Sequence, residues 1–219
     1  MPQIFRPGAN TILRIAMVAL IVIPAIAIVL GVTLVRSNYA TGVGMYRTQP
    51  VPFSHKHHVG GLGLDCRYCH TGVETSPVAG VPPTETCMTC HSQLWTTARM
   101  LAPVRESLAN RTPLRWTRVN DIPAYAYFDH AIHIAKSVGC SSCHGNVAEM
   151  PLMRKTEPLT MEWCLACHRE PERHLRPPDK IFSTDWTPPE DQLVEGRRLK
   201  NSTYHINKAH LTDCSVCHR

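Results

Sequence analysis

All ten cysteines of this 219-residue chain lie in copies of one short frame, Cys-x-x-Cys-His, and none is left over. Two thiols at this spacing add to the two vinyl groups of one heme, and the histidine that follows binds the iron. Five recurrences exclude chance, so the sequence predicts five covalently bound hemes c. The predicted thioether cysteines are Cys66, Cys69, Cys87, Cys90, Cys140, Cys143, Cys164, Cys167, Cys214 and Cys217, and the proximal histidines are His70, His91, His144, His168 and His218.

Zinc binding and disulfide bonding explain these cysteines less well. A zinc site needs four ligands, so five Cys pairs would leave one pair unmatched and five histidines without a role. Disulfides across two-residue gaps would form strained local loops and would also leave the adjacent histidines unexplained.

The frames belong to a longer internal repeat. Phe53 begins an F-x-H-x-x-H pattern that recurs at Phe128, an offset of 75 residues, and the frames that follow keep similar offsets of 74 and 77. A third copy is present only in part, because His205 and Cys214 continue the period whereas Lys208 stands where a second histidine is expected. The chain therefore contains two diheme modules and one monoheme half module.

The repeat also predicts the distal ligands of the irons. The first-position histidines, which are His55, His130 and His205, are expected to serve the leading heme of each module. The second-position histidines, His58 and His133, are expected to serve the two trailing hemes, but spacing does not decide which serves which. Alternative distal ligands are Met153, a thioether that would raise a heme potential, and His210. His57 and His174 lie outside the repeat and are expected to be solvated.

The elements that must position these ligands begin with a membrane anchor. Residues 15–35 carry no charge, and a helix of 21 residues would be about 32 Å long, which is enough to span a bilayer. Arg6 and Arg14 precede it, so residues 1–14 are predicted to be cytoplasmic and the heme domain extracytoplasmic, at the cell inner membrane. A cleaved signal peptide is the competing interpretation. Its apolar region would be shorter and would end in small residues, unlike Ser37-Asn38-Tyr39-Ala40.

The composition predicts a mostly irregular fold with short α-helices, in which porphyrins replace much of the aliphatic core. Residues 37–219 leave about 37 residues for each heme, and the chain contains 18 prolines. The formal charge of +6 does not indicate nucleic-acid binding, because five hemes bring propionates of opposite charge. A helix interrupted near Pro103 is expected over residues 92–110, a short strand or extended segment over 114–119, and an ordered loop or surface wrap over 170–190.

The predicted organisation follows from these features. After the anchor come a linker (36–52), diheme module 1 (53–110), a connector (111–127), diheme module 2 (128–175), a proline-rich wrap (176–200) and the monoheme half module (201–219).

Nearly the whole chain resembles the pentaheme cytochrome c subunit of alternative complex III. The resemblance lies in the anchor and in the ordered motifs PFSHKHHVGGLGLDCRYCH, VPPTETCMTCH, YFDHAIHIAKSVGCSSCH, MPLM, MEWCLACHR and CSVCHR, and the F-x-H-x-x-H modules also resemble class III cytochromes. The resemblance implies an electron-relay subunit of a quinol:electron-acceptor oxidoreductase. Implied partners are polytopic quinol-binding membrane subunits, an iron–sulfur subunit, and a monoheme cytochrome c or similar acceptor.

Because quinol chemistry then belongs to partner subunits, the chain is expected to be no enzyme by itself and to have no catalytic residue. Two alternatives remain. One is a self-sufficient, membrane-anchored multiheme quinol dehydrogenase, in which a heme near the membrane contacts quinol directly. The other is a multiheme reductase with one open heme, which would bind small ligands such as nitrite or carbon monoxide.

Overall fold

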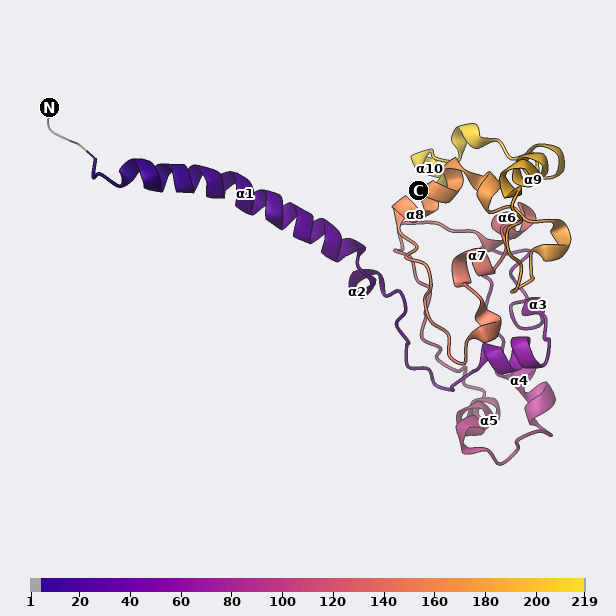
Figure 1. Cartoon of the computed structure of the whole chain (residues 1–219). Helices are drawn as coiled ribbons and strands as arrows, with labels where there is room; N and C mark the ends of the chain where they lie inside the picture. Colours follow the sequence, from indigo (N-terminus) through magenta and orange to yellow (C-terminus); the bar gives the residue numbers. More distant parts are fainter. Residues whose placement is uncertain (1–4, 219) are drawn as a thin grey trace. The chain divides into compact units, whose positions relative to one another are not determined.

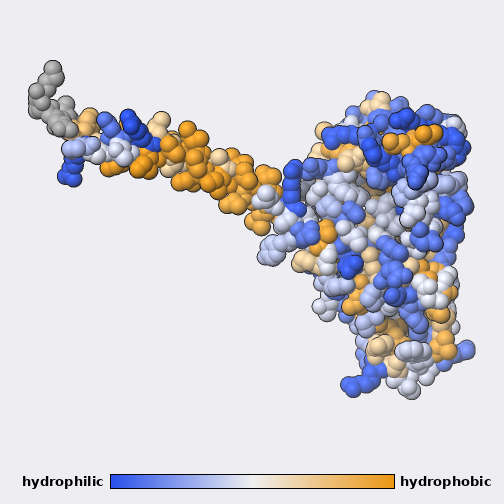
Figure 2. Space-filling model, in the orientation of Figure 1, coloured by the Kyte–Doolittle hydropathy of each residue, from blue (hydrophilic) through white to orange (hydrophobic). Residues whose placement is uncertain are grey.

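The computed structural model describes residues 5–218 and divides the chain into two compact units, Met1–Gly42 and Val43–Arg219. The first unit contains helix α1 (Ala9–Arg36) and the single turn α2 (Asn38–Thr41). Apolar side chains cover α1 and none of its residues is buried (Figure 2). The helix extends the predicted 15–35 span at both ends, and its length and composition suit either a membrane anchor or a signal sequence.

The second unit consists of short helices joined by irregular segments (Figure 1). No strand occurs in residues 5–218, where only two isolated bridges form, Tyr46 with Arg154 and Val138 with Leu175. The predicted fold class is therefore confirmed. The α-helices are α3 (Cys66–Cys69), α4 (Thr84–His91), α5 (Ala102–Asn110), α6 (His130–Ala135), α7 (Ser141–His144), α8 (Met161–Arg169), α9 (Gln192–Arg198) and α10 (Cys214–Cys217). The 3-10 helices are η2 (Arg99–Leu101), η3 (Val147–Glu149), η4 (Pro171–Arg173), η5 (Pro178–Lys180) and η7 (Lys208–His210), and the π-helices are η1 (Lys56–Gly61) and η6 (Leu199–Thr203).

Each Cys-x-x-Cys-His frame lies on a helical turn, which places its two sulfurs on neighbouring positions of one face. The leading frames occupy single turns (α3, α7 and α10), whereas the trailing frames end the longer helices α4 and α8. Local capping explains two of the starts. The Asp65 carboxylate accepts a hydrogen bond from the Arg67 backbone N–H, and the Thr160 hydroxyl accepts one from that of Trp163.

The aliphatic core of the second unit is small, as the composition predicts. One cluster joins Val73, Ile134 and Ile181 and packs against Cys140, so it lies beside the third frame. Leu175 and Leu199 are each 1% exposed and lie in the C-terminal part of the unit. Because the aliphatic core is small, the fold mainly holds the Cys-x-x-Cys-His frames and the histidines in place.

A buried ion cluster holds the C-terminal part of the chain together. Glu172, at the turn η4, accepts hydrogen bonds from the ammonium groups of Lys200 (2.8 Å) and Lys208 (3.3 Å). The Gln192 side chain at the start of α9 donates to the carbonyls of Glu172 and Leu175, each at 2.9 Å. Burial alone would raise the pKa of Glu172, but the two lysines outweigh it and lower the pKa to about 2.

Two connecting segments differ from expectation, and a third matches one of its two alternatives. Helix α5 begins at Ala102 with Pro103 in its first turn, where a missing N–H costs no hydrogen bond, so Pro103 starts the helix rather than interrupting it. Residues 114–119 are extended without a strand partner, and the Gln49 amide bonds both the N–H and the carbonyl of Thr117. The 170–190 segment is more than a surface wrap, because Leu175 and Arg176 in it are buried.

Candidate heme sites

The two F-x-H-x-x-H patterns adopt the same local geometry. In the first, the Phe53 ring stacks on the His58 ring at 4.4 Å and meets the His55 ring edge-on at 5.0 Å. In the second, Phe128 stacks on His133 at 4.4 Å and meets His130 edge-on at 4.8 Å. The phenylalanine of each pattern thus fixes two imidazoles at once, which gives the phenylalanine a structural reason to recur.

The second-position histidines are also oriented in the same way. Nδ1–H of His58 donates to the Ser54 carbonyl at 2.9 Å, and Nδ1–H of His133 donates to the Asp129 carbonyl at 2.6 Å, both four residues back. A carbonyl only accepts, so the proton resides on Nδ1 and the lone pair of Nε2 remains available. This is the tautomer that a metal-binding histidine needs when it coordinates through Nε2.

Most histidines of the frames also donate Nδ1–H to a carbonyl, but their acceptors lie at other positions along the chain. Four of them donate Nδ1–H to a backbone carbonyl: His70 to Gly80 (2.7 Å), His91 to Leu94 (3.1 Å), His168 to Leu211 (2.8 Å) and His218 to Tyr125 (3.0 Å). The fifth, His144, has its Nδ1 at 2.9 Å from the Asn120 amide. When Oδ1 of that amide is turned to face His144 it accepts Nδ1–H, and this buried oxygen otherwise has no partner.

Three histidines of the F-x-H-x-x-H patterns face the histidine of a frame. The ring centroids are separated by 6.2 Å for His58 and His91, 6.4 Å for His130 and His144, and 6.1 Å for His133 and His168. Two imidazoles bound to opposite faces of one metal, with bonds of about 2 Å each, place their centroids about 6 Å apart. The three pairs therefore have the spacing that one iron between them requires, and each lies within a single module.

His55 lies near the frame histidine His70, although no ring contact joins the two side chains. Its pKa is lowered to about 4 by burial, then by the neighbouring charges of His70 and His58. Its buried Nδ1 has no hydrogen-bond partner. The pKa of His144 is also lowered to about 4, first by burial and then by His130, so both rings are neutral at pH 7 and retain a lone pair for a metal.

The fifth frame is the least complete site. Within residues 5–218 the His218 ring contacts Tyr125 at 6.0 Å, and no ring contact joins it to His205 or His210. His205 has a positive φ of 48°, and the His210 ring is exposed and hydrogen-bonded to Asp213. Of the remaining candidates, Met153 is half-buried, while His57 is exposed as expected. His174 is half-buried rather than solvated, and burial lowers its pKa.

Contacts between the frames place successive sites beside one another. The Tyr68 and Thr89 hydroxyls of the first two frames are 3.0 Å apart, and the backbone N–H of Tyr127 donates to the Cys217 carbonyl at 2.7 Å. Nδ1–H of His130 donates at 2.8 Å to the Pro77 carbonyl, which joins module 2 to the loop of module 1. In Figure 1, α4 lies towards one end of the second unit, and α8 and α10 lie at the other.

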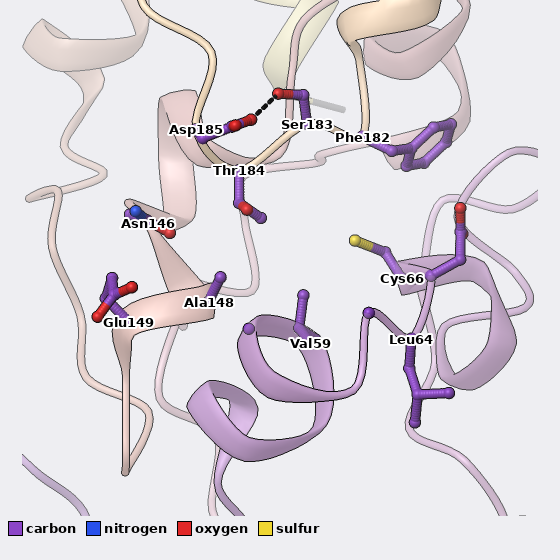
Figure 3. A pocket seen from close by; sticks show the side chains of 13 residues that line it. Val59, Leu64, Cys66, Asn146, Ala148, Glu149, Phe182, Ser183, Thr184 and Asp185 are labelled. Carbon is purple, nitrogen blue, oxygen red and sulfur yellow. Dashed lines mark hydrogen bonds between the residues drawn. The ribbon is translucent and has the colours of Figure 1, made fainter.

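A cavity of about 420 Å³ borders the first frame (Figure 3). The Cys66 sulfur points into it, and other parts of its wall come from Val59, Leu64, Asn146, Ala148 and Glu149, and from residues 182–185. This volume lies in the range typical of small-molecule sites. A cavity with a thiol on its wall fits part of a group that is attached through that thiol.

Comparison with known proteins gives one distant relative. No family model matches the chain. Over 177 residues the chain is 26% identical to the menaquinone reductase multiheme cytochrome c subunit of Nitratidesulfovibrio vulgaris strain Hildenborough, and the match covers 79% of this chain and 78% of that protein. Together with the five Cys-x-x-Cys-His frames, this likeness supports the assignment of the chain as a multiheme c-type cytochrome that takes part in electron transport.

Proposed function

We propose that the chain is the electron-relay subunit of a membrane-bound, quinone-linked oxidoreductase complex and that it holds five hemes c. The observation that carries the proposal is the set of three histidine pairs at 6.1–6.4 Å, each joining an F-x-H-x-x-H pattern to a frame. When bound, each heme supplies reversible one-electron iron chemistry. An iron with two imidazole ligands has no position open for substrate, which favours electron transfer over catalysis.

Ring contacts support three of the ligand pairs proposed for the first four irons, and the electrostatic effect of His70 on His55 supports the fourth. His58 and His91, His130 and His144, and His133 and His168 form three of the pairs, and His55 with His70 forms the fourth. In this proposal each trailing heme takes its distal histidine from its own module. Sequence spacing alone does not decide between His58 and His133 for these hemes. For the fifth heme the repeat still proposes His205 opposite His218, with His210 as the alternative, and Met153 stays an alternative distal ligand of one heme.

The chain's own residues perform three tasks in this relay. The cysteines attach the porphyrins covalently. The carbonyls that accept Nδ1–H fix the tautomer of seven of the proposed ligands and would hold their rings in place when the iron is bound. The half-buried positions of His55 and His144 would limit the access of water to the irons that they bind. No residue is assigned a catalytic role.

The finer proposal concerns the partners and the direction of electron flow. The resemblance to the pentaheme subunit of alternative complex III supports quinol oxidation by polytopic partner subunits, with a cytochrome c or similar acceptor and an iron–sulfur subunit as the other partners. Helix α1, uncleaved, would anchor the chain with its N-terminus in the cytoplasm and its hemes outside. The name of the relative, which describes a menaquinone reductase, instead supports a second candidate function in which electrons flow towards menaquinone.

Stopped-flow spectroscopy of the intact complex, purified from membranes with the full chain, distinguishes these functions. Menaquinol added to the oxidised complex should reduce its hemes within milliseconds to seconds, and the isolated chain should remain oxidised. Reduction of the isolated chain would favour the self-sufficient quinol dehydrogenase instead. Reoxidation of a prereduced complex by menaquinone, without any reduction by menaquinol, would favour the second candidate. A complex inert to both would contradict the proposal.

A further inference from the structure

Arg176 is a buried cation beside the third frame. Arg176 is only 3% exposed. Among the residues that the structure describes, no carboxylate pairs with it. Buried charges are normally paired because removing an ion from water is costly, so an unpaired buried arginine indicates a function.

All hydrogen-bond partners of the guanidinium are neutral oxygens. Nη2 donates to the hydroxyls of Ser141 (2.7 Å) and Ser142 (3.2 Å), the two residues between Cys140 and Cys143. Nη1 donates to the Ser183 carbonyl at 3.1 Å, and the Trp186 ring lies 4.5 Å from the guanidinium carbon. These contacts hold the position of the cation but do not neutralise it.

The backbone around Arg176 leaves it little freedom to move. Its N–H donates to the Ser137 carbonyl at 3.2 Å, and its carbonyl accepts from the hydroxyl of Ser137, which is fully buried. Gly139 provides the space for the guanidinium, because a Cβ at that position would overlap it. The positive charge is therefore fixed against the third frame.

We propose that Arg176 raises the reduction potential of the third heme. The inference rests on the proposed attachment of that heme at Cys140 and Cys143. Reduction lowers the positive charge of the iron by one, so a fixed cation nearby favours the reduced state. At a separation of about 10 Å and an effective dielectric constant of about 20, the effect on the redox equilibrium is roughly tenfold. The third heme would then hold electrons more strongly than the same ligands alone allow.

Spectroelectrochemical titration of the full chain in detergent tests the inference. Arg176→Gln should lower one of the five midpoint potentials by about 59 mV, the equivalent of a tenfold change for one electron. Arg176→Lys keeps the charge and should restore most of that potential. Arg173→Gln, three residues away, removes an exposed arginine and should shift no potential comparably.

A second pair of variants keeps Arg176 in place in case its replacement prevents folding. Ser142→Asp puts a carboxylate beside Nη2, which neutralises the guanidinium and should lower the same potential, whereas Ser142→Asn should not. The five frames carry different residues at this position, so substitution there is compatible with heme attachment.

Unchanged potentials in Arg176→Gln, or in Ser142→Asp where Arg176→Gln does not fold, would overturn the inference. An equal fall in Arg176→Lys and Arg176→Gln would also overturn it, because packing rather than charge would then be responsible. Heme content separates this result from a failure of the proposed function. A wild-type chain with fewer than five hemes contradicts the proposed function, whereas five hemes with unshifted potentials contradict only the role of Arg176.

Discussion

At the scale of single residues, the tautomer of the histidines is what suits them to bind heme iron, because a proton on Nδ1 leaves the lone pair of Nε2 available. Seven of the proposed ligands donate Nδ1–H to a backbone carbonyl, and Nδ1 of His144 lies 2.9 Å from the side-chain amide of Asn120. The exceptions are His55, whose Nδ1 is buried without a partner, and His205. His205 is the weakest of the proposed distal ligands, because it also has a positive φ of 48° and no ring contact with His218.

His58 and its neighbour His57 offer a direct comparison between a proposed ligand and a bystander. In His58→Ala one iron should lose an axial imidazole, because the ring facing His91 is removed, and one of five hemes should become high-spin. His57→Ala should leave the spin state unchanged, since its ring is exposed and faces no frame histidine. Ferric electron paramagnetic resonance measures both, and a high-spin signal of equal size in the two variants would refute the assignment of His58.

The sequence predicts residues more readily than it predicts their partners. Cysteine spacing identifies the thioether and proximal positions, and the repeat identifies histidines that the structure brings opposite His91, His144 and His168. The carbonyls of Gly80, Leu94 and Leu211 could not be predicted, because every residue carries a carbonyl and no residue type marks the one that accepts. Asn120 is likewise distant in sequence from His144, and only the fold brings them together.

At the scale of elements, the contact between η1 and η3 depends on a glycine. Gly60 lies against the Ala148 backbone, and a Cβ there would overlap the carbonyl oxygen, whereas the nearest atom to a Cβ on Gly61 is 3.7 Å away. Gly60→Ala should therefore destabilise the second unit by about 1–3 kcal/mol, and Gly61→Ala should cost less than about 1 kcal/mol. Thermal unfolding followed by circular dichroism gives both values. Equal losses would show that η1 and η3 do not pack as described.

The Glu172 cluster predicts a pH-dependent contribution to stability. Its pKa is lowered from 4.5 to about 2 in the folded state, so its stabilisation is complete above pH 4.5 and is lost as the pH falls towards 2. Glu172→Gln should cost about 2 kcal/mol at pH 7, because the charged hydrogen bonds from Lys200 and Lys208 are lost, and much less at pH 2.

Glu190→Gln, which replaces an exposed carboxylate in the same region, is the control and should have little effect at any pH. Unfolding free energies measured across pH 2–7 decide the matter. A cost of Glu172→Gln that does not change with pH would contradict the ionic role of this side chain.

The C-terminal region shows why the sequence predicts the proline-rich segment only in part. Its prolines correctly indicate the absence of long elements. The burial of Leu175 and Glu172 depends on α9, η6 and η7 folding back over them, and these contacts join residues 17 to 36 positions apart. Local composition does not encode such contacts.

At the scale of the whole molecule, the proposed role of the N-terminal helix as an anchor makes a prediction about the mature protein. The account predicts that α1 is retained, so the mature chain should have a mass that includes residues 9–36 as well as five hemes. Intact-mass spectrometry of protein extracted from membranes measures this directly. A mass that corresponds to a chain starting after Arg36 would instead identify α1 as a signal sequence.

The central claim is that each module supplies both axial ligands of its own irons. The most direct test is a cryo-electron microscopy structure of the heme-loaded chain within its complex, at a resolution that identifies the ligands of every iron. The account predicts His58 with His91, His130 with His144, His133 with His168, and His55 with His70 on four separate irons. Any of these pairs divided between two irons, or an iron among the four with a water in place of a histidine, would contradict it.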